Sequence, residues 1–145
     1  MASISGGEYR ILLSVDGGST YKSFALESDS SFEMNAETRE CTSKDDAVYR
    51  KYITSAKTWT ISGSALFGDD SATSWNPDDL YTYIGAEVDV KITQCAAGSS
   101  TPVSGETFIQ GDAILTQLSA SFPDKDNAMF NFTLQGNGAW AIGTV

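Results

Sequence analysis

The sequence predicts a mainly β fold, a β-sandwich with one or two short helices, and three observations support this class. Hydrophobic and polar residues alternate with period two over several segments, as they do in strands that are buried on one face. Turn sequences containing Gly, Asp, Asn and Pro separate these segments. The 145 residues are 41% hydrophobic and 19% charged, which fits one folded domain over residues 1–145.

The alternation defines the strands in chain order. The first covers about residues 9–15 and ends at Asp16-Gly17-Gly18, a tight hairpin turn because glycine accepts positive φ. Further strands are predicted over residues 21–26, 32–37, 58–67, 87–93, 114–122, 130–135 and 139–142.

The apolar members of these rows form the predicted core. They are Phe32, Met34, Trp59, Ile61, Phe67, Val88, Val90, Leu118, Phe130, Phe132 and Leu134. Within 114–122, strict alternation puts Ile114 on the same face as Leu118, and Leu115 on the opposite face with Gln117.

Two segments depart from the strand pattern. Ser43 followed by Asp46 resembles a capping box, and the i,i+4 pair Val48 and Tyr52 predicts a short helix over about residues 45–53. The sequence Asn76-Pro77-Asp78-Asp79 predicts a second helix, because it supplies a cap, a proline at the first position and acids in the first turn.

Two further segments are rich in small and polar residues. We expect a flexible N-terminal arm over about residues 1–7 and a mobile loop over about residues 94–106.

The charge of the chain argues against a nucleic-acid binding surface. The formal net charge is −10, and an acidic surface repels phosphate. No apolar run approaches the roughly 20 residues that span a bilayer, so no membrane association is expected. The N-terminus has neither the basic nor the apolar region of a signal peptide, which predicts synthesis in the cytoplasm.

The chemistry of an enzyme is missing from the sequence. With no histidine, Ser-His-Asp and Cys-His arrangements are excluded, and no phosphate-binding glycine loop occurs. We therefore expect no catalytic, metal or cofactor site. Cys41 and Cys95 are expected to be reduced in a chain without an export signal, although a disulfide between them stays open.

Four segments carry a family resemblance in their order along the chain. Residues 32–38 read FEMNAET and continue to Cys41-Thr42-Ser43-Lys44-Asp45, and residues 59–67 read WTISGSALF. Gly111-Asp112-Ala113-Ile114 then begins a strand, and residues 130–139 read FNFTLQGNGA. This series resembles the major tail tube proteins of siphophages and of phage-like gene transfer agents.

The resemblance implies a structural virion protein that is not an enzyme. Six copies would form a ring, the rings would stack into a hollow tail tube, and the inner sheets would join across subunits into a barrel through which DNA passes during ejection. The implied partners are further copies of the chain, a tape measure protein, a tail terminator and baseplate proteins. The implied location is the virion tail, assembled in the cytoplasm of the bacterial host.

An inner wall along which DNA slides should carry no cations that grip phosphate. Four strands have polar faces of this kind, and we expect them to line the lumen. The residues are Glu33, Asn35, Glu37, Thr58, Thr60, Ser62, Ser64, Gln117, Ser119, Ser121, Asn131, Thr133 and Gln135. The candidate contacts between rings are Thr42, Ser43, Lys44, Asp45, Trp75 and Trp140.

Two other functions stay open at this point. The chain could be another virion β-sandwich, such as a decoration or baseplate protein, or a carbohydrate- or protein-binding β-sandwich module. The type of particle (phage, gene transfer agent or tailocin) is not fixed by the sequence.

Overall fold

The computed structural model describes residues 6–24, 27–46, 48–67, 74–96 and 102–145. It contains eight strands and short helical segments. The strands are β1 (Tyr9–Ser14), β2 (Lys22–Phe24), β3 (Glu27–Glu40), β4 (Tyr52–Leu66), β5 (Ser74–Trp75), β6 (Glu87–Gln94), β7 (Thr107–Ser121) and β8 (Met129–Thr144). The helical segments are η1 (Gly6–Glu8), η2 (Lys44–Asp46), α1 (Pro77–Leu80) and η3 (Tyr81–Tyr83).

All eight strands belong to one sheet, in the order β3-β4-β8-β7-β6-β1-β2-β5. The pairs are antiparallel except β2 with β5, which are parallel. The sheet bends back on itself. As a result, Phe24 in β2 and Phe132 in β8, which are not on neighbouring strands, stack with ring centroids 3.8 Å apart. The mainly β class is therefore confirmed, and the two layers of the predicted sandwich are the two halves of one continuous sheet.

The core lies between these two halves. Of the predicted core residues, Trp59, Ile61, Val88, Val90, Phe130, Phe132 and Leu134 are buried. Phe32, Phe67 and Leu118 are partly buried and pack against the cluster. Met34 is wrong as a core residue, since 48% of it is exposed in β3, the edge strand of the sheet.

A β-bulge changes the predicted facing of β7. Leu115 pairs with Leu134 and Gln117 pairs with Thr133, so Thr116 is an extra residue in β7. Leu115 is fully buried as a result, and it shares the core side with Leu118. The expectation that Ile114 and Leu118 share a face was wrong, because strict alternation holds only where no residue is inserted.

The predicted helix over residues 45–53 is also wrong. Only Lys44–Asp46 form a single 3-10 turn, and Tyr52 and Ile53 belong to β4. Val48 is 88% exposed and Tyr49 81%, so an amphipathic helix here would have no apolar surface to pack on. The second predicted helix is confirmed: α1 continues into η3, and Gly85 follows with φ of +81°.

Parts of the predicted N-terminal arm and loop lie outside the described residues, namely 1–5 and 97–101. The described residues of the loop are hydrogen-bonded. Gln94 ends β6, Cys95 bridges to Pro102, and the Val103 amide donates to the Gln94 carbonyl at 3.0 Å. Cys41 is exposed, Cys95 is buried, and neither forms a disulfide.

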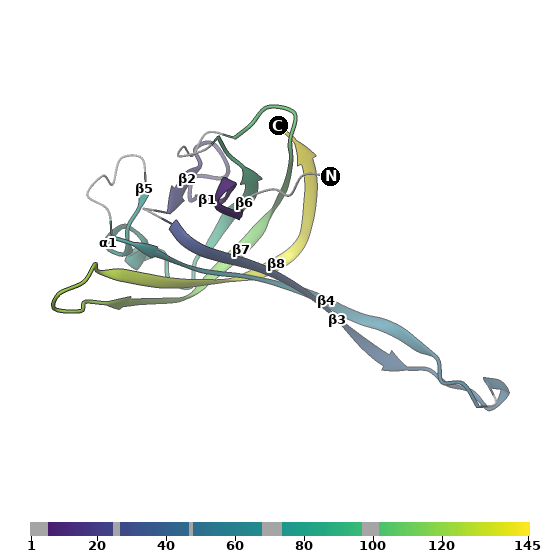
Figure 1. Ribbon diagram of the computed structural model, residues 1–145. Coiled ribbons are helices and arrows are strands. Elements are labelled where there is room, and N and C mark those ends of the chain that lie inside the picture. Colours follow the sequence, from purple (N-terminus) through teal and green to yellow (C-terminus); the bar gives the residue numbers. More distant parts are fainter. Residues whose placement is uncertain (1–5, 25–26, 47, 68–73, 97–101) are drawn as a thin grey trace.

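Figure 1 shows how these elements are arranged. The β3–β4 hairpin extends from the body as a long arm, whereas α1, β5 and the turn between β7 and β8 lie at the opposite end. The C-terminus lies on the body, away from the tip of the arm.

Candidate functional site

The strand register brings the four predicted polar rows onto one face of the sheet. Ser62 of β4 lies between Ser31 of β3 and Thr133 of β8, and Thr133 pairs in turn with Gln117 of β7. Directly paired residues point to the same side of a sheet, so the four rows form one surface, which we call the polar face. Its members are the 13 residues predicted from the sequence.

The polar face is open to solvent and carries no cation. None of its 13 residues is buried, and none of the nine Lys and Arg residues of the chain is among them. Hydrogen bonds link neighbouring strands across it, since Thr60 donates to Gln135 at 3.3 Å and the Ser31 and Ser62 hydroxyls lie 2.9 Å apart. These bonds hold short polar side chains flat on the sheet.

Two further polar residues, Asp29 and Ser31, continue the polar face beyond the 13 predicted residues. Asp29 pairs with Ser64 and Ser31 with Ser62, so both extend the row in β3. The alternation of Asp29, Ser31 and Glu33 was a usable signal. It was obscured because residues 27–31 are all polar, so no apolar residues alternate with Asp29 and Ser31 to indicate a strand.

Two long strand edges border the polar face. β3 is the last strand of the sheet, and in the described chain its outer edge has no pairing strand. On the other side β6 pairs with β7 only as far as Ile114. From Thr116 to Ser121 no described strand pairs with the outer edge of β7. β3, β4, β8 and the end of β7 thus make a four-stranded ribbon with an open edge on each side.

The arm beyond the body is exposed on both of its faces. A bulge between Glu37 and Thr38 marks its outer part, residues 38–55, which we call the arm tip. Every described side chain of the arm tip is exposed. Four of the candidate ring contacts lie here, at the hairpin end: Thr42, Ser43, Lys44 and Asp45.

Short hydrogen bonds order the hairpin end. The Thr42 hydroxyl donates to Glu40 at 2.9 Å and accepts from the Lys51 amide at 3.1 Å, which joins the two sides of the turn. The Asp45 amide donates to the Ser43 hydroxyl at 3.3 Å. The hairpin end is thus tied together by its own side chains although nothing covers it.

The two tryptophans that were candidate ring contacts differ in position. Trp75 is wrong as an interface residue, because it is 5% exposed and its indole N–H donates to the Leu13 carbonyl at 3.0 Å. It lies in β5, which pairs with β2 and so faces the core. Trp140 is partly buried and packs against the core from β8.

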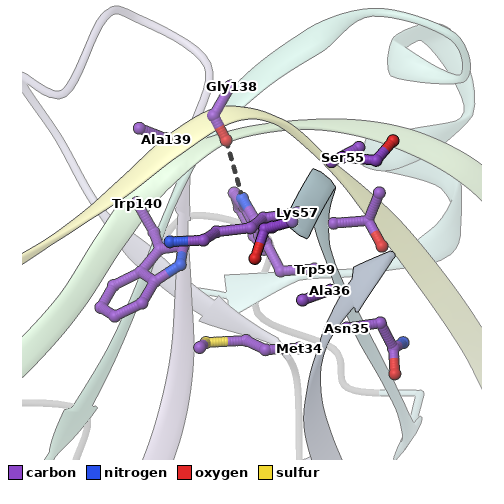
Figure 2. Close-up of a pocket in the computed structure, with 12 residues that line it drawn as sticks. Met34, Asn35, Ala36, Ser55, Lys57, Trp59, Gly138, Ala139 and Trp140 are labelled. Carbon is purple, nitrogen blue, oxygen red and sulfur yellow. Dashed lines mark hydrogen bonds between the residues drawn. The ribbon is translucent and has the colours of Figure 1, made fainter. Parts of the chain in front are cut away.

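A groove of about 760 Å³ lies where the arm leaves the body. Figure 2 shows Met34, Lys57 and Trp140 around it, with Trp59 at its base. The indole N–H of Trp59 donates to the Gly138 carbonyl at 3.0 Å. Trp59 therefore fastens the base of the arm to β8.

Glycines make room for the Trp59 ring. A Cβ at Gly111 would lie 2.9 Å from the indole, and a Cβ at Gly136 would overlap it. These glycines of β7 and β8 form the slot that the ring fills. The sequence shows the glycines, but only the register shows that they face Trp59.

Acidic groups gather on β6 and β7 beside the polar face. Asp89 pairs with Asp112 across the two strands. Their hydrogen bond, with partial burial and the neighbouring charges of Asp112, Glu87 and Asp16, raises the pKa of Asp89 to about 6. Burial raises the pKa of Tyr21, and the neighbouring charges of Asp89, Asp112 and Asp16 raise it further.

The described part of the chain has neither a metal-binding cluster nor a membrane-spanning helix. No group of three or more His, Cys, Asp or Glu side chains there is arranged to hold a metal ion. No helix among the described residues has the length and apolar character to cross a membrane.

Comparisons with known proteins agree with this geometry. Residues 5–141 match the family described as phage tail tube protein. Curated protein sequences give no match. Among solved structures, the tail of an empty gene transfer agent particle with C6 symmetry is similar with a TM-score of 0.76 and 17% identity, covering 98% of this chain and 100% of that chain.

Two further structures share the fold. The SPP1 tail tube is similar with a TM-score of 0.73 and 13% identity, over 99% of this chain and 80% of that chain. The baseplate of the anti-feeding prophage is similar with a TM-score of 0.69 and 10% identity, over 100% of this chain and 98% of that chain. The family match covers most of the sequence, and this chain belongs to the phage tail tube protein family.

Proposed function

We propose that six copies of this chain form a ring, that the rings stack into the hollow tube of a virion tail, and that the polar face lines the lumen through which DNA passes. The observation that carries the proposal is the four-stranded ribbon with a cation-free polar face and an open edge on each side. The family match and the C6 symmetry of the similar gene transfer agent tail support it.

The open edges explain how a ring would close. An exposed edge strand presents unpaired N–H and C=O groups and pairs readily with another strand. If β3 of one copy pairs with the end of β7 in the next, six ribbons give a closed barrel of 24 strands. With strands about 4.8 Å apart and tilted by about 40°, such a barrel has a backbone diameter of roughly 48 Å.

The residues of the polar face suit a lumen. DNA binds proteins mainly through phosphate contacts with Lys and Arg, each of which releases counterions. The face offers hydroxyls, amides and the carboxylates of Glu33 and Glu37, and these carboxylates repel phosphate. DNA can therefore move along it without being held.

The arm supplies the contacts between rings in this proposal. Its tip is exposed and carries Thr42, Ser43, Lys44 and Asp45 at a distance from the body. Trp140, in the groove at the arm base, is a second contact residue. A tape measure protein, a tail terminator and baseplate proteins would meet the tube inside and at its ends, after assembly in the host cytoplasm.

Lysines on the polar face test the proposal. Ser119→Lys, Asn131→Lys and Thr133→Lys together should leave the tubes intact but slow DNA ejection about tenfold or more. The reason is that each lysine–phosphate contact at about 4 Å is worth about 1 kcal/mol in water, and 1.4 kcal/mol is a factor of ten. Electron microscopy reports the tubes, and the rate of DNA release from the particles reports passage.

A matched variant controls for the added charge. Ser19→Lys, Ser104→Lys and Thr144→Lys change the net charge equally at exposed positions off the polar face. This control should eject DNA at the wild-type rate. Equal rates of DNA ejection for the wild type, the polar-face variant and the control variant would contradict the lumen assignment. Closed rings that never stack would favour a baseplate-type ring.

A further inference from the structure

The end of the molecule opposite the arm carries an exposed apolar groove. It has a volume of about 490 Å³, and its lining includes Asp78 of α1, Tyr81 of η3, Leu118 of β7 and Phe122, which directly follows β7. Phe122 is 72% exposed and Tyr81 76% exposed. The Phe122 ring is held in place, because it contacts Phe67 with centroids 5.4 Å apart.

The arm tip has the matching apolar side chains. Val48 is 88% exposed, Tyr49 81% and Tyr52 55%, so apolar surface is presented far from the body of its own subunit. A large aromatic such as Tyr49 is the kind of residue that anchors an interface when it enters a pocket.

Charge distinguishes the arm tip from the rest of the chain. Residues 38–55 hold four of the nine basic and three of the nineteen acidic residues, so the arm tip has a formal charge of +1 and the other 127 residues carry −11. The groove end carries Asp78 in α1, and Asp124 and Asp126 with Lys125 in the turn after β7. Two acidic bodies repel each other, whereas a basic tip and an acidic groove attract.

We propose that the groove formed by α1, η3 and the end of β7 receives the arm tip of a second copy of this chain in the adjoining ring. This inference rests on the proposed function and specifies the surface that the arm meets. Because the donor and the acceptor lie at opposite ends of one molecule, the contact is heterologous and repeats from ring to ring, as growth of a tube requires.

Cross-linking tests the contact directly. In a Cys41→Ser background, which removes the exposed thiol and leaves the buried Cys95, Tyr49→Cys is combined with Phe122→Cys. A short bismaleimide added to assembled tubes should join chains into a ladder of covalent multimers. Either substitution alone, and Tyr49→Cys combined with Ser19→Cys at an exposed site away from the groove, should give at most a small fraction of that ladder.

Charge exchange is the second test, and it does not depend on the aromatic residues. Asp78→Lys changes the groove, and Arg50→Glu changes one of the four basic residues of the arm tip. Each should raise at least about tenfold the subunit concentration at which rings stack, and the double variant should recover most of the loss. Rings should still form in all three, because the ribbon edges are unchanged.

The outcomes separate this contact from the proposed function. Two results would overturn the docking of the arm tip in this groove. The first is tubes whose cross-linked ladder is no stronger than that of the single-cysteine variants. The second is a double charge variant that stacks no better than either single charge variant. Absence of both rings and tubes in the wild-type protein would instead contradict the proposed function.

Discussion

Replacing Gly136 with alanine should loosen the attachment of the arm to the body. Trp59 of β4 lies over Gly136 of β8, and an added Cβ would overlap the indole ring. The ring would have to move, and the hydrogen bond from its N–H to the Gly138 carbonyl, 3.0 Å long, would be strained or lost.

The size of the effect follows from two contributions. Overpacking a well-filled site costs about 1–3 kcal/mol, and loss of one hydrogen bond costs about 0.5–1.5 kcal/mol. We therefore expect Gly136→Ala to lower the free energy of unfolding by about 1.5–4.5 kcal/mol. For a chain of this size that corresponds to a decrease in Tm of about 5–15 °C.

Thermal denaturation followed by circular dichroism, at a protein concentration too low for assembly, measures this change. Gly6→Ala is the matched control, because a Cβ at Gly6 meets nothing within 4 Å, and its Tm should be unchanged. A Gly136→Ala protein with the Tm of the wild type would refute the role of the glycine slot in holding Trp59.

Three further predictions concern other parts of the fold. The pKa of Asp89 is about 6 in the folded chain and lower in the unfolded chain, so the folded state binds the proton more tightly. The free energy of unfolding, measured by urea titration, should therefore rise as pH falls from 7 to 5, and Asp89→Asn should remove that rise. Phe24→Ala should lower the free energy of unfolding by about 3–5 kcal/mol, because the ring joins the two halves of the bent sheet. A thiol reagent should modify Cys41 quickly in the free subunit but Cys95 only after unfolding, and stacking should slow the reaction of Cys41.

The sequence predicted the strands and the polar face well, because period-two alternation reports directly which side chains share a side. Thr60, Ser62 and Ser64 could be assigned to one side of a strand in this way, and the register then aligned them with Asn131 and Thr133. Alternation alone does not place these rows side by side, since that depends on which strands are neighbours; the expectation that they share one surface came from the lumen that the family resemblance implies.

The failures have a common cause in tertiary structure. Thr116 is an inserted residue, and nothing in the local pattern distinguishes it from its neighbours, so the facing of Ile114 was reversed. The helical spacing of Val48 and Tyr52 was real, but an isolated helix without a packing surface gives way to the pairing of β3 with β4. Met34 has the period of a core residue, yet it lies in the edge strand β3 and 48% of it is exposed.

The central claim is that the polar face lines the lumen of a tube. Cryo-electron microscopy of tubes assembled from the purified chain tests it most directly, because the map shows which side of β3, β4, β7 and β8 borders the channel. We predict stacked six-fold rings with Ser62, Asn131 and Thr133 on the inner wall. A tube with these residues on its outer surface, or buried between subunits, would contradict it.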